Sequence, residues 1–247
     1  MINIPITNAG LLYITGMSLS FVDGTTVAVS AGQCRDHTNV NDILTTASAN
    51  INVATPGIIN SLDTGTLAPN KLYYVWAVAD SSKFQPTGFL ISLSMTQPTL
   101  PFGYDMFRRI GAVLTNATAA PNTNVLKFYQ TGDDALRTMW YDVAYATDIT
   151  TGSSATYAPV NITVSVPAAA IEVVIYSVFT PTAGGDKLQL RPTGASAVNG
   201  YAVLSGSVAA VAKTGHLRLP CNATPSIDYK VTGSATALSV QGYIDQL

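Results

Sequence analysis

The sequence predicts an all-β fold: an N-terminal β-sandwich or barrel-like module followed by a C-terminal jelly-roll-like β-sandwich. Glu172 is the only glutamate among 14 acidic residues, so the Glu–Lys pairs that stabilise exposed helix faces are missing. The chain also holds 19 glycines and 13 prolines, which divide it into short apolar segments of strand length. At 247 residues it is long enough for one large β domain or for two.

The N-terminal module is expected to span residues 1–130. Met1–Gly10 is predicted to be an extended arm, because Pro5 and the lack of periodicity argue against a helix. A β-meander should follow, with a hairpin at Asp23-Gly24. Its predicted strands are Leu11–Ile14, Ser18–Val22 and Thr26–Ser30, followed by a strand pair in Ile43–Ile59 and a closing strand at Val125–Tyr129.

The densest apolar material lies between residues 72 and 114. Leu72–Ala79 is a nearly continuous run of β-branched, aromatic and small apolar residues, which predicts a strand covered on both faces in the middle of a sheet. Phe89–Met95 and Asp105–Leu114 are predicted to be the next two strands. Two prolines and a glycine in Gln97–Gly103 forbid a regular element between them.

Arg108 and Arg109 are adjacent on the third of these strands. On an extended backbone their side chains point to opposite faces, and only one of them can face solvent cheaply. The other is expected to bind backbone carbonyls or an aspartate across the proline-rich loop, and a role in ligand binding is the alternative.

The order Leu-Tyr-Tyr-Val-Trp-Ala-Val-Ala-Asp, Ile-Ser-Leu-Ser, and Leu-Pro-Phe-Gly-Tyr-Asp-Met-Phe-Arg-Arg-Ile-Gly resembles a pattern in virion structural proteins of tailed bacteriophages. Those proteins are described as tail-fibre, head-fibre or decoration components. The resemblance covers about Asp63–Gln130, and it includes Tyr104, Arg108 and Arg109 as structural or interface residues. It implies a place on a virion assembled in the host bacterial cytoplasm.

Gln33–Asp42 is the most polar stretch of the N-terminal half, with Asp36, His37 and Asp42 as candidate acid, base or metal groups. Because His37 has no second histidine nearby and the spacing matches no zinc or calcium loop, a hydrogen-bonded loop is expected. A metal site and a subunit contact are the alternatives.

Thr131–Asp134 is the expected boundary between the modules, since turn residues and charge lie there between two apolar segments. The adjacent aspartates are expected to form a turn and not a catalytic pair. The C-terminal module should span residues 135–247, and its strands at 8–12-residue spacing are typical of a sandwich or jelly roll. Its expected strands are Ala135–Ala146, Ile162–Val166, Ile171–Phe179, Lys187–Arg191, Ala202–Val211, His216–Leu219, Ser226–Val231 and Leu238–Ile244.

Known catalytic patterns are missing from the sequence: there is no phosphate loop, nucleophile elbow, zinc-ligand cluster or Rossmann fingerprint. The only histidines, His37 and His216, lie in different modules. A non-enzymatic protein without cofactor or metal is therefore expected. Two free, buried thiols are expected of Cys34 and Cys221, in preference to a disulfide.

Aromatic residues suggest a possible sugar-stacking surface for a host glycan. Trp76 lies in the most apolar strand and is assigned to the core. Trp140 and Tyr141 face opposite ways on a strand, which leaves one ring of the pair for an interface, and Tyr145 follows nearby.

Only 11% of the residues are charged, so much of the surface is expected to be hidden in an assembly. A net charge of −2 without a basic stripe argues against nucleic acid as a partner. The N-terminus shows no signal peptide and no apolar run is long enough to insert into a membrane. The prediction is an oligomeric tail or head appendage, a dimer or trimer that contacts capsid, portal, adaptor or tail proteins. A capsid decoration protein and a carbohydrate-binding host-recognition module are the alternatives.

Overall fold

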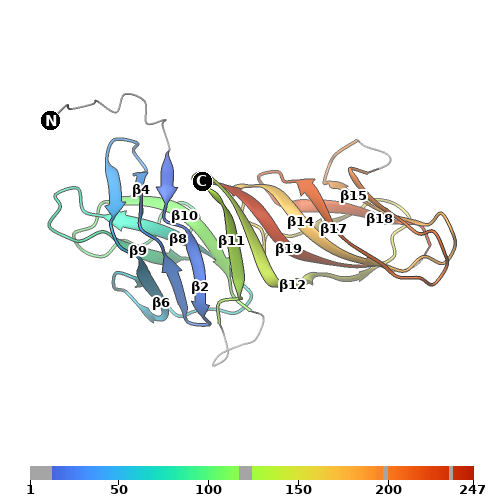
Figure 1. The fold of residues 1–247 in the computed structure, drawn as a ribbon, viewed down its shortest axis with the longest axis horizontal. Coiled ribbons are helices and arrows are strands. Elements are labelled where there is room, and N and C mark those ends of the chain that lie inside the picture. The colour runs from blue at the N-terminus through green and yellow to red at the C-terminus, as the bar shows by residue number, and fades with distance from the viewer. Residues whose placement is uncertain (1–12, 117–123, 197–199, 234–235) are drawn as a thin grey trace. The chain divides into compact units, whose positions relative to one another are not determined.

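The computed structural model describes residues 13–116, 124–196, 200–233 and 236–247, without the side chains of residues 133 and 143–151. The expected arm at Met1–Gly10 lies outside these residues. The described chain forms strands and turns throughout and contains no helix, so the protein is all-β, as the sequence predicted (Figure 1). Among the same residues no helix is long and apolar enough to cross a membrane.

The chain divides into two compact units. The first unit comprises residues 1–126, 132–137 and Leu247, and the second comprises residues 127–131 and 138–246. The expected boundary at Thr131–Asp134 falls in a β-hairpin, because Thr131–Asp133 belong to a strand and the turn follows at Asp134 and Ala135. Asp134 has a positive φ of 48°, which suits a tight turn, so the turn that was predicted for the aspartates is present here.

The first unit is a β-sandwich of two sheets. A seven-stranded sheet has the order β10-β8-β9-β7-β6-β3-β2, and a three-stranded sheet has the order β1-β4-β5. The strands are β1 (Ile14–Gly16), β2 (Leu19–Asp23), β3 (Thr26–Val29), β4 (Gly32–Arg35), β5 (Asp42–Thr45), β6 (Ala49–Pro56), β7 (Ser61–Leu62), β8 (Leu72–Ala79), β9 (Gly88–Ser92) and β10 (Met106–Leu114).

Strand β8 lies inside the large sheet, between β10 and β9, as its continuous apolar run predicted. Seven of its eight residues are buried, and its Trp76 and Val78 pack with Leu90 of β9 and Phe107 of β10. Trp76 is only 4% exposed, which confirms its assignment to the core. Strand β10 lies at the edge of this sheet.

The second unit is a jelly roll. Its strands, together with the hairpin strands that enter it, are β11 (Phe128–Asp133), β12 (Leu136–Gly152), β13 (Ala158–Asn161), β14 (Ala170–Phe179), β15 (Lys187–Pro192), β16 (Ala202–Ser205), β17 (Lys213–Pro220), β18 (Ser226–Val231) and β19 (Thr236–Gln246). One sheet has the order β11-β12-β19-β14-β17 and the other has the order β13-β18-β15-β16.

The jelly roll follows from how the chain alternates between these sheets. Eight consecutive strands from β12 to β19 divide into two four-stranded sets, β12-β19-β14-β17 and β13-β18-β15-β16, which is the double Greek-key order of that fold. Strand β11 adds an edge to the first set. The interior of the unit contains Tyr141 and Tyr243, whose rings meet edge to face with their centroids 6.2 Å apart.

Two expected strands of this unit differ from the structure. The strand expected at Ala202–Val211 ends at Ser205, and residues 206–212 are not in a strand. The other expected strand, at Ile162–Val166, was wrong. Residues Ile162–Val166 form a turn, in which the N–H groups of Ser165 and Val166 donate to the carbonyl of Ile162. The strand lies just before it, at β13, and contains Pro159. Because β13 is the edge strand of its sheet, a residue without an N–H donor is tolerated there.

Arg137, a side chain that is only 2% exposed, joins three segments of the first unit. Its guanidinium donates to the carbonyls of Gly16 (2.5 Å), Met17 (2.7 Å) and Ile110 (3.1 Å), and its Nε donates to Asp134 (2.9 Å). Two of these acceptors sit in unusual backbone. Met17 has a positive φ of 51°, and Ile110 is the extra residue of a bulge in the pairing of β10 with β8. The guanidinium therefore stabilises both irregularities.

Replacing this guanidinium by an apolar side chain should destabilise the protein. In Arg137→Met several buried carbonyls lose their donor, so the free energy of unfolding should fall by about 3 kcal/mol. Urea denaturation followed by circular dichroism measures the change. The control is Arg218→Met, at an exposed position of β17, which should change the value by less than about 0.5 kcal/mol. Equal stabilities of the two variants would contradict the assigned role of Arg137.

Candidate functional site

The polar loop that follows β4 is organised by the carboxylate of Asp36. This side chain, 1% exposed, accepts hydrogen bonds from the Thr38 hydroxyl, the Asn41 side-chain amide and the backbone N–H groups of Val40 and Asn41. The hydrogen-bonded loop predicted over Gln33–Asp42 is confirmed for residues 36–41, whereas Gln33–Arg35 belong to β4 and Asp42 begins β5. The described residues contain no cluster of three His, Cys, Asp or Glu side chains that could hold a metal ion.

Burial alone would raise the pKa of Asp36, but the hydrogen bonds from Thr38, Asn41 and Val40 outweigh it and lower the pKa below its ordinary value. A carboxyl whose pKa is lower in the folded than in the unfolded state stabilises the fold above the unfolded pKa of about 4. This contribution is lost as the pH falls through the folded pKa.

The variant Asp36→Ala should therefore be less stable than wild type at pH 7, by about 2 kcal/mol, because the loop donors lose a charged acceptor. The difference should persist down to about pH 4 and shrink at lower pH. Urea denaturation at a series of pH values measures it. The control, Asp42→Ala, removes a carboxylate whose ion pair with Arg35 is solvent-exposed, and should cost about 0.5 kcal/mol. A pH-independent loss in Asp36→Ala would contradict this role.

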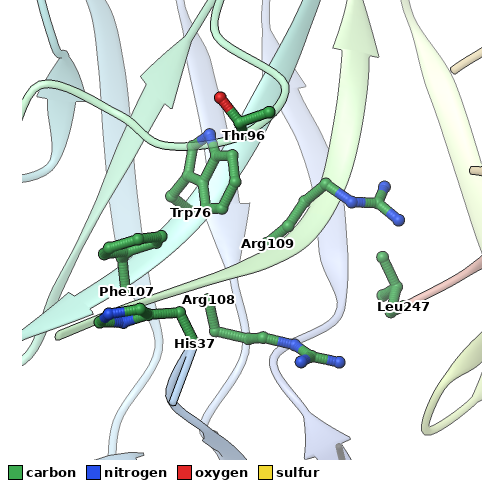
Figure 2. Close-up of a pocket in the computed structure, with 7 residues that line it drawn as sticks. All are labelled: His37, Trp76, Thr96, Phe107, Arg108, Arg109 and Leu247. Atoms are coloured by element: carbon green, nitrogen blue, oxygen red, sulfur yellow. The ribbon is translucent and has the colours of Figure 1, made fainter. Parts of the chain in front are cut away.

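A pocket of about 300 Å³ lies in the first unit beside β10, at the edge of the seven-stranded sheet (Figure 2). The loop after β4 closes onto this edge, where the His37 N–H donates to the carbonyl of Phe107 at 2.8 Å. The side chains of the same two residues stack, with ring centroids 3.9 Å apart and planes 7° apart. The pocket is lined by His37, Trp76, Thr96, Phe107, Arg108, Arg109 and Leu247.

The structure brings Arg108 and Arg109 to this one pocket. Their backbone alternates as expected, since Arg109 pairs with Trp76 and Arg108 with Ala77. Both nevertheless line the pocket because β10 is an edge strand, and Figure 2 shows both guanidinium groups extending toward Leu247. Both side chains are half-buried.

Tyr104 has a structural position next to this pocket. Its ring packs against the cluster of Trp76, Val78, Leu90 and Phe107, and its hydroxyl donates to the carbonyl of Pro86 at 2.9 Å. Burial, and to a smaller extent the charge of Asp80, raise the pKa of this phenol. The Tyr104 hydroxyl thus ties the loop before β10 to the loop before β9.

In the second unit, Tyr141 is 2% exposed and donates from its hydroxyl to the carbonyl of Ser165, so it belongs to the core. Its neighbour Trp140 is half-buried on the alternate face of β12. The side chain of Tyr145 lies outside those that the structure describes. A shared platform of these aromatic rings is therefore not present in the described side chains.

A different polar and aromatic cluster, which the sequence analysis missed, lies on the sheet β13-β18-β15-β16. The guanidinium carbon of Arg191 sits 3.7 Å from the ring centroid of Tyr157, and Arg191 Nε lies 3.0 Å from Asp228 Oδ2. Arg191 alternates with Leu190, which is fully buried, so the cluster lies on the face away from the core. The register of Arg191 with Asp228 needs long-range strand pairing, which no local sequence signal reveals.

Tyr201 lies beside this cluster and is 61% exposed. The Tyr201 backbone N–H donates to the carbonyl of Leu190, the residue before Arg191. The preceding residue, Gly200, lies close to Tyr157, because a Cβ atom built on Gly200 would be 3.2 Å from the Tyr157 hydroxyl oxygen. The outer face of this sheet therefore combines the exposed ring of Tyr201 with the phenol of Tyr157 and the guanidinium of Arg191, which is held by the buried carboxylate of Asp228.

Both cysteines are free, as predicted. Cys34 is buried and Cys221 is half-buried. Burial raises the pKa of each thiol to about 12, although Arg108 and Arg137 act in the opposite direction on Cys34. Neither thiol is suited to act as a nucleophile near neutral pH.

Comparison with known proteins gives little further information. No protein-family model and no curated protein sequence matches the chain. Among solved structures, the carbohydrate binding module CBM6cm-2 from Cellvibrio mixtus lichenase 5A, in complex with cellotriose, aligns at 14% identity with a TM-score of 0.21. The alignment covers 55% of this chain and 87% of that one. A similarity this weak supports no conclusion about a ligand.

Proposed function

We propose that the protein is a non-enzymatic structural component of a tailed-phage particle, an oligomeric tail or head appendage. The first unit attaches the chain to other proteins of the particle, and the second unit is the exposed module. The sequence resemblance over Asp63–Gln130 supports the location. The observation that carries the attachment role is a pair of phenylalanines on adjoining loops of the first unit.

These residues, Phe84 and Phe102, are 87% and 102% exposed. Large aromatic side chains so fully exposed to water indicate a surface that a partner covers. The proposed partner is a neighbouring protein of the particle. Only 11% of the residues are charged, and a surface with so few charges offers little repulsion against association with another protein.

The loops that carry this pair are held in place before any partner arrives. The carboxylate of Asp80 accepts from the N–H groups of Ser82 (2.8 Å), Phe84 (3.0 Å) and Gln85 (3.0 Å). The second loop is attached to the first through Tyr104 and through Asp105, whose carboxylate accepts from the Ser81 N–H at 2.8 Å. A surface that is already ordered binds with a smaller loss of conformational entropy.

Co-sedimentation with particles assembled without this chain tests the attachment role. Wild-type protein should sediment with such particles, and the double variant Phe84→Ser/Phe102→Ser should bind at least tenfold more weakly, because it loses most of the apolar area it can bury. The control is Val208→Ser, at a position of the second unit that is 57% exposed, which should bind as wild type does. Unchanged binding of the double variant would refute attachment through these loops.

A second candidate function is glycan binding by the jelly roll, and the face that carries Tyr157, Arg191 and Tyr201 favours it. The exposed Tyr201 ring can stack on a sugar, while the neighbouring guanidinium of Arg191 and phenol of Tyr157 can hydrogen-bond its hydroxyls. The buried Asp228 carboxylate holds Arg191 in place. This candidate is the carbohydrate-binding alternative, with Tyr157 and Tyr201 in place of Trp140, Tyr141 and Tyr145 as its aromatic residues.

Purified surface polysaccharide of the host bacterium is the probe for this second function. In affinity electrophoresis through a gel that contains it, wild-type protein should be retarded and Tyr201→Ala should lose most of the retardation. The control is Tyr129→Ala, since Tyr129 on β11 is similarly exposed, at 51%. Equal retardation of both variants, or none for wild type, would exclude this site.

A further inference from the structure

The outer face of the sheet β13-β18-β15-β16 carries a network of side chains around the ring of Tyr157, the residue before β13. The ring lies against the guanidinium of Arg191 on β15, although β18 lies between β13 and β15. On β18, the carboxylate of Asp228 contacts the same guanidinium, and Lys230 Nζ lies 5.8 Å from the ring centroid of Tyr157. This part of the face is therefore ordered by contacts between side chains of neighbouring strands.

The charge of this face is positive, whereas the whole chain has a net charge of −2. The four strands contain three cationic residues, Lys187, Arg191 and Lys230, and Asp228 is their only acidic residue. Lys187 and Arg191 alternate with the two buried leucines of β15, so they point away from the core. Lys230 pairs with Gln189, two residues from Lys187, and the two lysines are therefore neighbours on the sheet.

The ammonium groups of Lys187 and Lys230 are not neutralised by the protein. Among the residues that the structure describes, no carboxylate lies within ion-pair distance of either group. Asp186, which precedes Lys187, instead accepts hydrogen bonds from the Thr182 hydroxyl and from the N–H groups of Thr182 and Ala183. Both ammonium groups can therefore bind an anion that comes from outside the chain.

Exposed apolar and aromatic side chains lie beside these lysines. Tyr201 is 61% exposed, and Val203 on β16, which pairs with Gln189, is 41% exposed. At the opposite edge of the sheet, Pro159 on β13 is exposed as well. A face with an exposed ring next to unpaired ammonium groups matches a sugar chain that carries negative charge.

We propose that the glycan bound by this face is an acidic polysaccharide, whose uronate carboxylates contact Lys187 and Lys230 while Tyr201 stacks on a sugar ring. This inference rests on the second candidate function and adds the chemical class of the glycan. An ammonium group is a compact charge with three donors, so it can bind a carboxylate in more than one orientation of a flexible polymer. No bond is made or broken, and the face acts by binding alone.

Isothermal titration calorimetry on the full chain tests the class of glycan with two acidic polymers, polygalacturonate and alginate, and with their methyl esters, which keep the sugar rings but lack the charge. At least one acidic polymer should bind, its ester should bind at least tenfold more weakly, and the affinity for the acid should fall as the salt concentration rises. Equal binding of an acid and its ester would overturn the proposal but leave glycan binding as such intact. If neither acidic polymer binds, the proposal is wrong, whereas electrophoresis with the host polysaccharide decides the second candidate function separately.

Variants locate the charge-binding groups. Lys230→Gln should weaken binding of the acidic polymer at least fivefold and reduce its dependence on salt, because one ammonium group is lost. Tyr201→Ala should also weaken binding but leave the salt dependence unchanged, because it removes a stacking surface and no charge. The control, Lys71→Gln, removes the same charge from an exposed position of the first unit and should bind as wild type does. Thermal melting confirms that each variant is folded, and equal binding by Lys230→Gln and Lys71→Gln would overturn the assignment.

Discussion

The guanidinium of Arg137 is the interaction on which the first unit depends. Four backbone carbonyls accept from it, and they come from the end of β1, from the bulge of β10 and from the turn before β12. A bulge leaves its extra residue outside the ladder, so the Ile110 carbonyl needs a donor from elsewhere. Arg137 supplies that donor, and it thereby fixes the backbone immediately after Arg108 and Arg109.

The edge position of β10 has a direct consequence for the pocket. A strand inside a sheet separates its two faces, and its alternate side chains cannot share a cavity. At the edge, Arg108 and Arg109 reach the same space from opposite faces, while the loop after β4 closes the strand through the His37–Phe107 contacts. The same contacts cover part of an unpaired edge, which would otherwise be open to association.

The two units differ in what they offer a partner. In the first, carboxylates order the loops around exposed phenylalanines, as Asp80 does for Phe84 and Gln85. In the second, the jelly-roll pairing places Arg191 against Asp228 under the ring of Tyr157. In both arrangements the carboxylates are already engaged, by backbone N–H groups at Asp80 and by an arginine at Asp228. The proposed function uses these arrangements as preformed binding surfaces.

Much of the fold was predictable from local patterns. The apolar run of Leu72–Ala79 identified a strand with neighbours on both sides, and the regular spacing of strands and turns identified the jelly roll. Strand β13 was not predicted because it contains Pro159. A proline in a short segment argues against a strand unless that strand is known to lie at the edge of a sheet. That knowledge comes only from the sheet order.

The sites were harder to predict because they depend on long-range pairing. Arg137 lies between Leu136 and Thr138, and nothing in this local sequence marks it as buried, yet it is covered by segments more than 100 residues away. The register of Arg191 with Asp228, and the meeting of His37 with Phe107, likewise follow from strand order. The residue types alone identified Arg108 and Arg109 as candidate site residues, but they could not show that both line one pocket.

The mass of the purified chain in solution, measured by light scattering coupled to size exclusion, tests the central claim most directly. An assembly protein with this exposed apolar surface and this low charge should have about two or three times the mass of one chain, as a dimer or a trimer. A mass that stays at one chain at all concentrations would contradict the account of the protein as an oligomeric appendage.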